Sequence, residues 1–185
     1  DVAHYVTPGT PLDREAYKRG NSVYFPDRVV PMLPEKLSAD LCSLMEDVDR
    51  PCLAVRMVFD ANGKKKRHEF LRGVMRSAAS LTYAQAQSVF DGKPDAALSQ
   101  TARETLGALW AAYGALVKAR EARDPLDLDL PERRITIGAD GKIASIAFKE
   151  RLESMRLIEE FMVLANVAAA ETLEKARTPL RYRGH

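Results

Sequence analysis

Apolar and polar residues alternate along two stretches of the chain in the manner of β-hairpins. Leu53–Phe59 predicts a strand, Ala61-Asn62-Gly63 a turn, and Lys66–Val74 the returning strand. A second hairpin is predicted from Arg134–Ile137 and Lys142–Phe148, joined by Ala139-Asp140-Gly141. We expect both hairpins to be antiparallel and to pack against the helices that other parts of the chain predict.

Helical periodicity dominates between and after the hairpins. Thr82–Phe90 predicts a short helix ending at Gly92. Thr101 and Glu104 form a capping-box pattern that predicts the start of a long helix, which should run to about Arg123, before Asp124-Pro125. Its apolar residues recur at helical spacing: Leu106, Leu109, Trp110, Tyr113, Leu116 and Val117.

The last predicted helix, Glu150–Lys175, has an unusual middle. Phe161–Ala170 is apolar on nearly every face, which is typical of a helix buried on most sides. We therefore expect an α+β fold in which antiparallel hairpins pack against long helices, with Glu150–Lys175 at its centre.

The first fifty residues are less regular. Asp1–Val6 is interpreted as part of a strand, Leu12–Lys18 predicts a helix and Ser22–Phe25 an extended segment. Ser38 precedes Ala39-Asp40-Leu41 and predicts a brief helical turn that begins at this serine.

Composition narrows the class of protein. The 185 residues are 46% hydrophobic and 29% charged, which fits a folded domain and excludes disordered and collagen-like chains. A net charge of +2 is too even to indicate nucleic-acid binding. Cys42 and Cys52 are too few for a disulfide framework and lack zinc-site spacing, which favours a reduced, cytoplasmic protein.

Targeting signals are not recognisable. No stretch approaches the roughly 18 apolar residues of a membrane span, so we expect no membrane partner. The first residues lack the basic start and apolar run of a signal peptide, and there is no initiator methionine. We expect the chain to be a piece of a longer protein.

Two polar side chains accompany the apolar middle of the last helix. Glu159 and Asn166 are seven residues apart, close to two turns, and therefore share a face. One interpretation is a structural hydrogen-bonded pair, because unpaired burial of such groups is costly. The other is a polar strip that lines a substrate channel. The pattern alone leaves both open.

Other candidate groups indicate little by themselves. His4, His68 and His185 are scattered without metal-ligand spacing. Asp127-Leu128-Asp129 has the form of a magnesium-binding triplet, although such triplets are common in loops. The basic run Lys64-Lys65-Lys66-Arg67 is interpreted either as a phosphate contact or as a solvated turn. The common nucleotide-binding and nucleophile motifs are missing from the sequence.

Several segments together resemble one known family. They are Asp1–Val6, Leu12–Ala16, Ser22-Val23-Tyr24-Phe25-Pro26, Val30-Pro31-Met32-Leu33-Pro34, Leu37-Ser38, Leu41–Leu44, Leu81-Thr82-Tyr83 and Leu157–Asn166. In order and spacing these resemble the catalytic RNB domain of the ribonuclease II and ribonuclease R exoribonucleases. The likeness covers nearly all of residues 1–185, and Leu37-Ser38 and the loop near Pro125 favour the ribonuclease R branch.

The resemblance implies processive 3′→5′ hydrolysis of single-stranded RNA to nucleoside 5′-monophosphates, with Mg²⁺ held by a cluster of aspartates. It assigns to the pocket for the RNA 3′ end Tyr24, which packs against the terminal nucleotides, together with Glu159 and Asn166. The second aromatic of the family pocket falls at Leu128, so base stacking there is lost. Ser80 stands where a basic residue is common, which predicts a weaker phosphate contact.

The same resemblance places the chemistry outside the chain. The family's metal-binding aspartates precede Asp1 and its active-site arginine follows His185, whereas Asp1, Asp127 and Asp129 match no family ligand. Residues 1–185 are therefore interpreted as a partial RNB catalytic domain with no catalytic or metal residue of its own, and the isolated piece is expected to be inactive. Single-stranded RNA is the expected partner, and no obligate protein partner is predicted. The alternatives are a non-catalytic RNA-binding relative and a purely structural fragment.

Overall fold

The computed structural model describes residues 1–93, 98–123, 133–148 and 150–182. The chain divides into two compact units, each assembled from segments distant in sequence. The first contains Asp1–Leu53, Arg72–Ser80 and Asp129–Glu150, and the second contains Ala54–Leu71, Leu81–Leu128 and Arg151–His185. The division passes through the long hairpin β3–β4.

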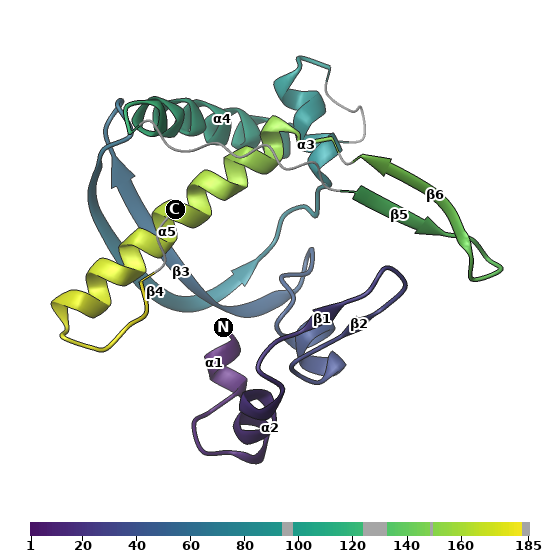
Figure 1. The fold of residues 1–185 in the computed structure, drawn as a ribbon. Helices are drawn as coiled ribbons and strands as arrows, with labels where there is room; N and C mark the ends of the chain where they lie inside the picture. Colours follow the sequence, from purple (N-terminus) through teal and green to yellow (C-terminus); the bar gives the residue numbers. More distant parts are fainter. Residues whose placement is uncertain (94–97, 124–132, 149, 183–185) are drawn as a thin grey trace. The chain divides into compact units, whose positions relative to one another are not determined.

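Short elements around a small apolar cluster make up the start of the first unit (Figure 1). They are α1 (Val2–Tyr5), α2 (Pro11–Arg19), the antiparallel pair β1 (Val23–Tyr24) and β2 (Val29–Val30), and the π-helical turn η1 (Lys36–Leu41). Ala16, Leu33 and Leu37 form the buried centre of the cluster. The Thr10 side chain accepts from the backbone N–H of Asp13 and so caps α2, as a threonine before a helical run commonly does.

Two expectations for this region are wrong. Asp1–Val6 is not a strand, because Val2–Tyr5 forms the helix α1, and Tyr5 and Val6 pack against the apolar cluster. This packing overrides the strand preference of valine and tyrosine. The turn near Ser38 begins earlier, at Lys36, so Ser38 lies inside η1 and its hydroxyl donates to the carbonyl of Pro34 (3.3 Å).

The second predicted hairpin is confirmed within the first unit. β5 (Arg133–Ile137) pairs antiparallel with β6 (Ile143–Phe148), and Gly141 in the turn has a φ of +75° that favours glycine. Every residue of β6 is exposed, including Ile146 and Phe148 at 59% and 69%.

Three helices form the core of the second unit: α3 (Tyr83–Phe90), α4 (Gln100–Glu121) and α5 (Glu153–Lys175), which pack against one another (Figure 1). Phe90 of α3 stacks on Trp110 of α4, with ring centroids 4.0 Å apart. The Ser154 hydroxyl of α5 donates to the carbonyl of Tyr83 (2.9 Å). Leu157 and Ala168 of α5 are buried, with 3% and 0% exposure.

The hairpin of β3 (Asp49–Phe59) and β4 (Lys65–Arg76) confirms the first predicted hairpin, with β3 starting four residues earlier and β4 longer at both ends. Its tip belongs to the second unit, where Gly63 is buried against Ala115 and Ala119 of α4. Phe59 meets Phe161 of α5 edge-on, with centroids 6.5 Å apart. Long helices together with small antiparallel sheets confirm the predicted α+β fold, and β3–β4 is the hairpin whose tip packs against the helices. No helix formed by the described residues is long and apolar enough to cross a membrane.

The helix starts needed correction. α4 is capped by Ser99, whose hydroxyl accepts from Ala102 N–H at 3.2 Å, so the box expected at Thr101 is displaced by one half-turn. α5 begins at Glu153 rather than Glu150. The expected burial of its apolar middle is also wrong for these 185 residues, because Met162 and Val167 are 60% and 40% exposed.

Candidate functional site

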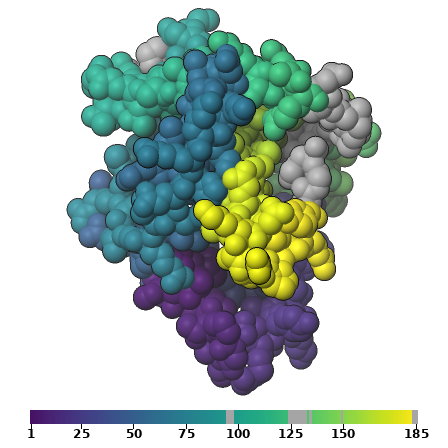
Figure 2. Space-filling model, turned by 90° about the vertical axis from the view of Figure 1, so that its left-hand side faces the viewer, coloured from purple at the N-terminus to yellow at the C-terminus, as the bar shows by residue number. Residues whose placement is uncertain are grey.

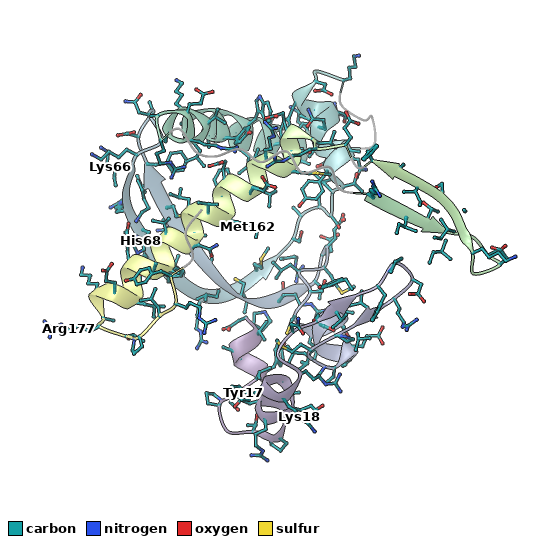
Figure 3. The ribbon with its side chains drawn as sticks, in the orientation of Figure 1. Tyr17, Lys18, Lys66, His68, Met162 and Arg177 are labelled. Atoms are coloured by element: carbon teal, nitrogen blue, oxygen red, sulfur yellow. The ribbon has the colours of Figure 1, made fainter. Side chains whose placement is uncertain are left out.

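One face of α5 combines acidic, apolar and amide side chains at the surface. Glu159, Met162 and Asn166 are all exposed, and their spacing of three and four residues places them on a single face. Met162 is labelled on α5 in Figure 3. This face, defined by these three residues, is called the α5 polar face below.

The two consecutive glutamates of α5 have different environments. Glu160 is only 11% exposed and pairs with Arg120 of α4 (Nη1–Oε1 3.5 Å) and, more loosely, with Arg123 (4.0 Å). Glu159 is 53% exposed and accepts a hydrogen bond from Arg151 (Nη2–Oε2 2.8 Å). Because consecutive helical residues point about 100° apart, only Glu159 belongs to the polar face.

The structure tests one of the two interpretations of Glu159 and Asn166, the structural hydrogen-bonded pair. No hydrogen bond joins these side chains, although both belong to the described part of the chain. Glu159 instead pairs with Arg151, and Asn166 is exposed. A mutual hydrogen-bonded pair is therefore wrong, and the polar strip that lines a substrate channel stays a prediction.

Tyr24 lies in β1 of the first unit, opposite Val29 in β2. Its side chain is 77% exposed and is therefore free to stack on a planar ligand. The adjacent Phe25 is already engaged, because the guanidinium carbon of Arg28 lies 4.9 Å from its ring centroid. Tyr24 belongs to the first compact unit and the α5 polar face to the second.

The other predicted positions divide into two groups. Leu128, Asp127, Asp129 and His185 lie outside the described residues. Ser80 is exposed, and its backbone N–H donates to Glu46 (2.8 Å). Asp1 is almost buried, and its carboxylate pairs with Arg72 (Nε–Oδ2 3.1 Å). The Asp1 carboxylate is therefore engaged in an ion pair with Arg72.

The described residues do not fit a magnesium site. They contain no group of three or more His, Cys, Asp or Glu side chains that would hold a metal ion. Cys42 and Cys52 are free thiols. A divalent cation needs several oxygen ligands around one point. Carboxylates such as Asp1, Asp49 and Glu159 pair with arginine instead.

The basic run near the tip of β3–β4 is partly neutralised. Lys65 is 12% exposed and pairs with Glu171 of α5, whereas Lys66 pairs with Asp60 (2.8 Å). In Figure 2 the yellow C-terminal end of α5 lies at the surface beside the blue hairpin. Lys66 therefore stabilises the hairpin turn, and Lys65 attaches the hairpin to α5. The interpretation of the whole basic run as a solvated turn is wrong for these two lysines.

His68 completes this attachment (Figure 3). Thr172 donates its hydroxyl proton to the carbonyl of Ala168 (2.9 Å), so it must accept from Nε2–H of His68 (2.7 Å). Nδ1 of His68 then accepts from Nζ of Lys65 (3.0 Å). His68 therefore has a structural role in this attachment.

The residue that sequence reasoning missed is Arg151. Arg151 precedes α5 and is eight positions from Glu159. Helical spacing therefore could not predict that the two side chains meet. Only the path of the chain before the first turn brings the two side chains together.

Comparison with known proteins places this geometry in a family. The family model described as RNB domain matches residues 1–185. Ribonuclease R of Vibrio parahaemolyticus is 41% identical over the whole chain, which covers 22% of that relative. Mycoplasma genitalium RNase R in complex with double-stranded RNA matches the whole chain and 33% of its own length, with a TM-score of 0.94 and 31% identity.

A more distant structure shares only the fold. Yeast Ssd1, described as a pseudonuclease, matches 94% of this chain and 21% of its own, with a TM-score of 0.66 and 18% identity. The chain spans 22% of the length of the Vibrio parahaemolyticus relative and 27% of that of Chlamydia pneumoniae ribonuclease R. The family expected from the sequence is confirmed, and with it the likeness to ribonuclease R: the chain belongs to the RNB domain family.

Proposed function

We propose that residues 1–185 are part of an RNB catalytic domain in a 3′→5′ exoribonuclease, which hydrolyses single-stranded RNA to nucleoside 5′-monophosphates. The observation that carries this proposal is the family match along the whole chain, at 41% identity to a ribonuclease R. The exposed α5 polar face supports the proposal. Its carboxylate and amide lie at the surface of a helix with an apolar middle, where they can form hydrogen bonds with an RNA end.

The pocket for the RNA 3′ end is assigned to Tyr24, Glu159, Asn166 and Leu128. The exposed Tyr24 ring stacks on a terminal base, an interaction worth about 1–3 kcal/mol whatever the base. Glu159 is an acceptor when ionised, so it binds ribose hydroxyl groups rather than phosphate oxygens. Asn166 supports the same nucleotide through its amide, and Leu128 provides apolar contact without ring stacking.

The metal chemistry is assigned to other parts of the polypeptide. Magnesium would stabilise the attacking and leaving oxygens of the phosphodiester when bound. Its ligands are not supplied by the described residues, where Asp1 is paired with Arg72. We therefore propose that residues 1–185 alone do not degrade RNA. Magnesium-dependent RNA loss caused by the purified piece would contradict this assignment.

A non-catalytic RNA-binding relative is the second candidate. The observation in its favour is that the RNB fold also occurs in a pseudonuclease. In that case the pocket residues would still bind an RNA end, while hydrolysis would be lost with the metal ligands. The two candidates differ in product formation and agree in RNA binding, so one assay separates them.

The test is degradation of a 5′-labelled single-stranded RNA by the full-length protein with Mg²⁺, compared with its Tyr24→Ala variant. Tyr17→Ala is the matched control, because Tyr17 is also in the first unit and is 90% exposed, but is not assigned to the pocket. We expect a one-nucleotide ladder whose final product changes length in Tyr24→Ala only. RNA binding without degradation would favour the non-catalytic relative, and identical ladders would remove Tyr24 from the pocket.

A further inference from the structure

We infer that Arg151 is a positioning residue for the RNA 3′-end pocket and acts by holding the Glu159 carboxylate in its binding orientation. The inference rests on the proposed function, since it takes Glu159 as a contact to the terminal nucleotide. It adds a residue that no sequence motif indicated and that lies outside the helix bearing the glutamate.

The geometry joins Arg151 to Glu159 by a direct contact. Arg151 directly precedes Leu152, the N-cap of α5. Its guanidinium extends along the first two turns of the helix to Glu159. Its Nη2 donates to Oε2 of Glu159 at 2.8 Å. This length is typical of a charge-assisted hydrogen bond. Arg151 is 31% exposed and Glu159 is 53% exposed, so the arginine is the more enclosed of the two.

Neighbouring charges on α5 have other partners, which makes the pairing selective. Glu160 is held by Arg120 of α4. Glu153 pairs with Arg156 (3.3 Å) and accepts from the Tyr113 hydroxyl (2.9 Å). Among the described residues, Arg151 is thus the cation that contacts Glu159, and the remaining acidic groups of the first two turns do not compete for this contact.

The chemical consequence concerns the two carboxylate oxygens. Arg151 engages Oε2, which restricts the rotation of a long side chain that would otherwise sample many rotamers. Oε1 is not used in this contact, and because the Glu159 side chain is 53% exposed, it is left for a ribose hydroxyl. The positive guanidinium also offsets the repulsion between Glu159 and the phosphates of an approaching RNA.

The experiment measures binding rather than turnover, so that it does not depend on metal chemistry. The full-length protein is titrated in EDTA with 5′-labelled single-stranded RNA that ends either in a ribonucleotide or in a 2′,3′-dideoxynucleotide. The variants are Glu159→Gln, Arg151→Ala, Arg151→Lys and the double variant Arg151→Ala/Glu159→Gln. Arg156→Ala is the matched control, because it breaks a comparable ion pair on the same helix.

We expect Glu159→Gln and Arg151→Ala each to reduce the preference for the ribonucleotide end by about tenfold. The double variant should be no weaker than either single variant, because both remove the same interaction. Arg151→Lys should restore part of the preference, and Arg156→Ala should leave it unchanged. Thermal unfolding of each variant is measured in parallel, and Arg151→Gln replaces Arg151→Ala if the latter does not fold.

The possible failures are distinguishable. If Glu159→Gln reduces the preference and Arg151→Ala does not, or if their effects add fully, the positioning role is refuted while the pocket assignment stands. If Glu159→Gln has no effect, or the wild-type protein binds no RNA, the proposed pocket fails and the positioning role fails with it. An equal loss in Arg156→Ala would reduce Arg151 to a general structural contact.

Discussion

Gly63 at the tip of β3–β4 provides a sharp test of how the second unit is packed. Its φ is +73°, a left-handed conformation that costs a residue with a side chain about 1–2 kcal/mol. A β-carbon at this position would lie 2.7 Å from Cβ of Ala119 and would also overlap the backbone carbonyl of Ala115. The carbonyl belongs to α4 and cannot move without disturbing the helix.

The expected cost of Gly63→Ala follows from these two effects. Overpacking against a rigid neighbour typically costs about 1–3 kcal/mol. Together with the backbone term, the change should weaken the attachment of the hairpin tip to α4 by about 2–5 kcal/mol. The alanine retains the hydrophobic character of the site, so the loss reports geometry rather than polarity.

Gly141→Ala is the matched control for this prediction. Gly141 also lies in a hairpin turn and has a φ of +75°, but no described atom lies within 4 Å of the position of its β-carbon. Hydrogen exchange of the full-length protein, read by peptides that cover the hairpin tip and the C-terminal half of α4, is the assay. We expect exchange at least about 30-fold faster there in Gly63→Ala, whereas Gly141→Ala should show only local loosening of its own turn.

Equal protection of α4 in wild type and Gly63→Ala would refute the reasoning. Such a result would mean that the hairpin tip does not rest on Ala115 and Ala119 in the folded protein. The attachment of Lys65 and His68 to the far end of α5 would then be the main contact between the hairpin and the helices.

Two further predictions concern titratable groups. Burial, reinforced by the hydrogen bond to Glu153, raises the pKa of the Tyr113 hydroxyl well above its ordinary value of 10.0. The folded state thus favours the protonated form, so this stability is complete below pH 10 and declines as the pH rises above it. Tyr113→Phe should lose about 1 kcal/mol in urea unfolding at pH 8 and should lack the alkaline decline; an unchanged pH profile would contradict the assignment. The hydrogen bond from Lys66, with backbone N–H groups, lowers the pKa of Asp60 below 3.8, so its contribution is present above this pH and is lost as the pH falls further. Asp60→Asn should make the protection factors at the hairpin tip, which are exchange rates corrected for the intrinsic effect of pH, independent of pH in this acidic range. Persistence of the wild-type profile would exclude the turn as its source.

Local sequence was sufficient wherever neighbouring residues determine the conformation. The hairpin turn at Gly63 and the end of the short helix near Gly92 were predicted because glycine is common at such positions, and both glycines have a positive φ that favours a residue without a β-carbon. The helix starts were less certain for a related reason. Ser99 and Thr101 both have side chains that can cap a helix and are two positions apart, so the residues alone do not distinguish them, and the structure has Ser99 as the cap.

The candidate site shows the same division more sharply. The family, the aromatic pocket candidate Tyr24 and an apolar helix with two consecutive glutamates could all be predicted from the residues alone. That Glu160 turns toward Arg120 while Glu159 stays exposed beside Arg151 became visible only in the folded chain. Ion pairs form between side chains that are close in space, whatever their separation in sequence. Lys65 and Glu171, for example, are 106 residues apart, and no periodicity along the chain relates them.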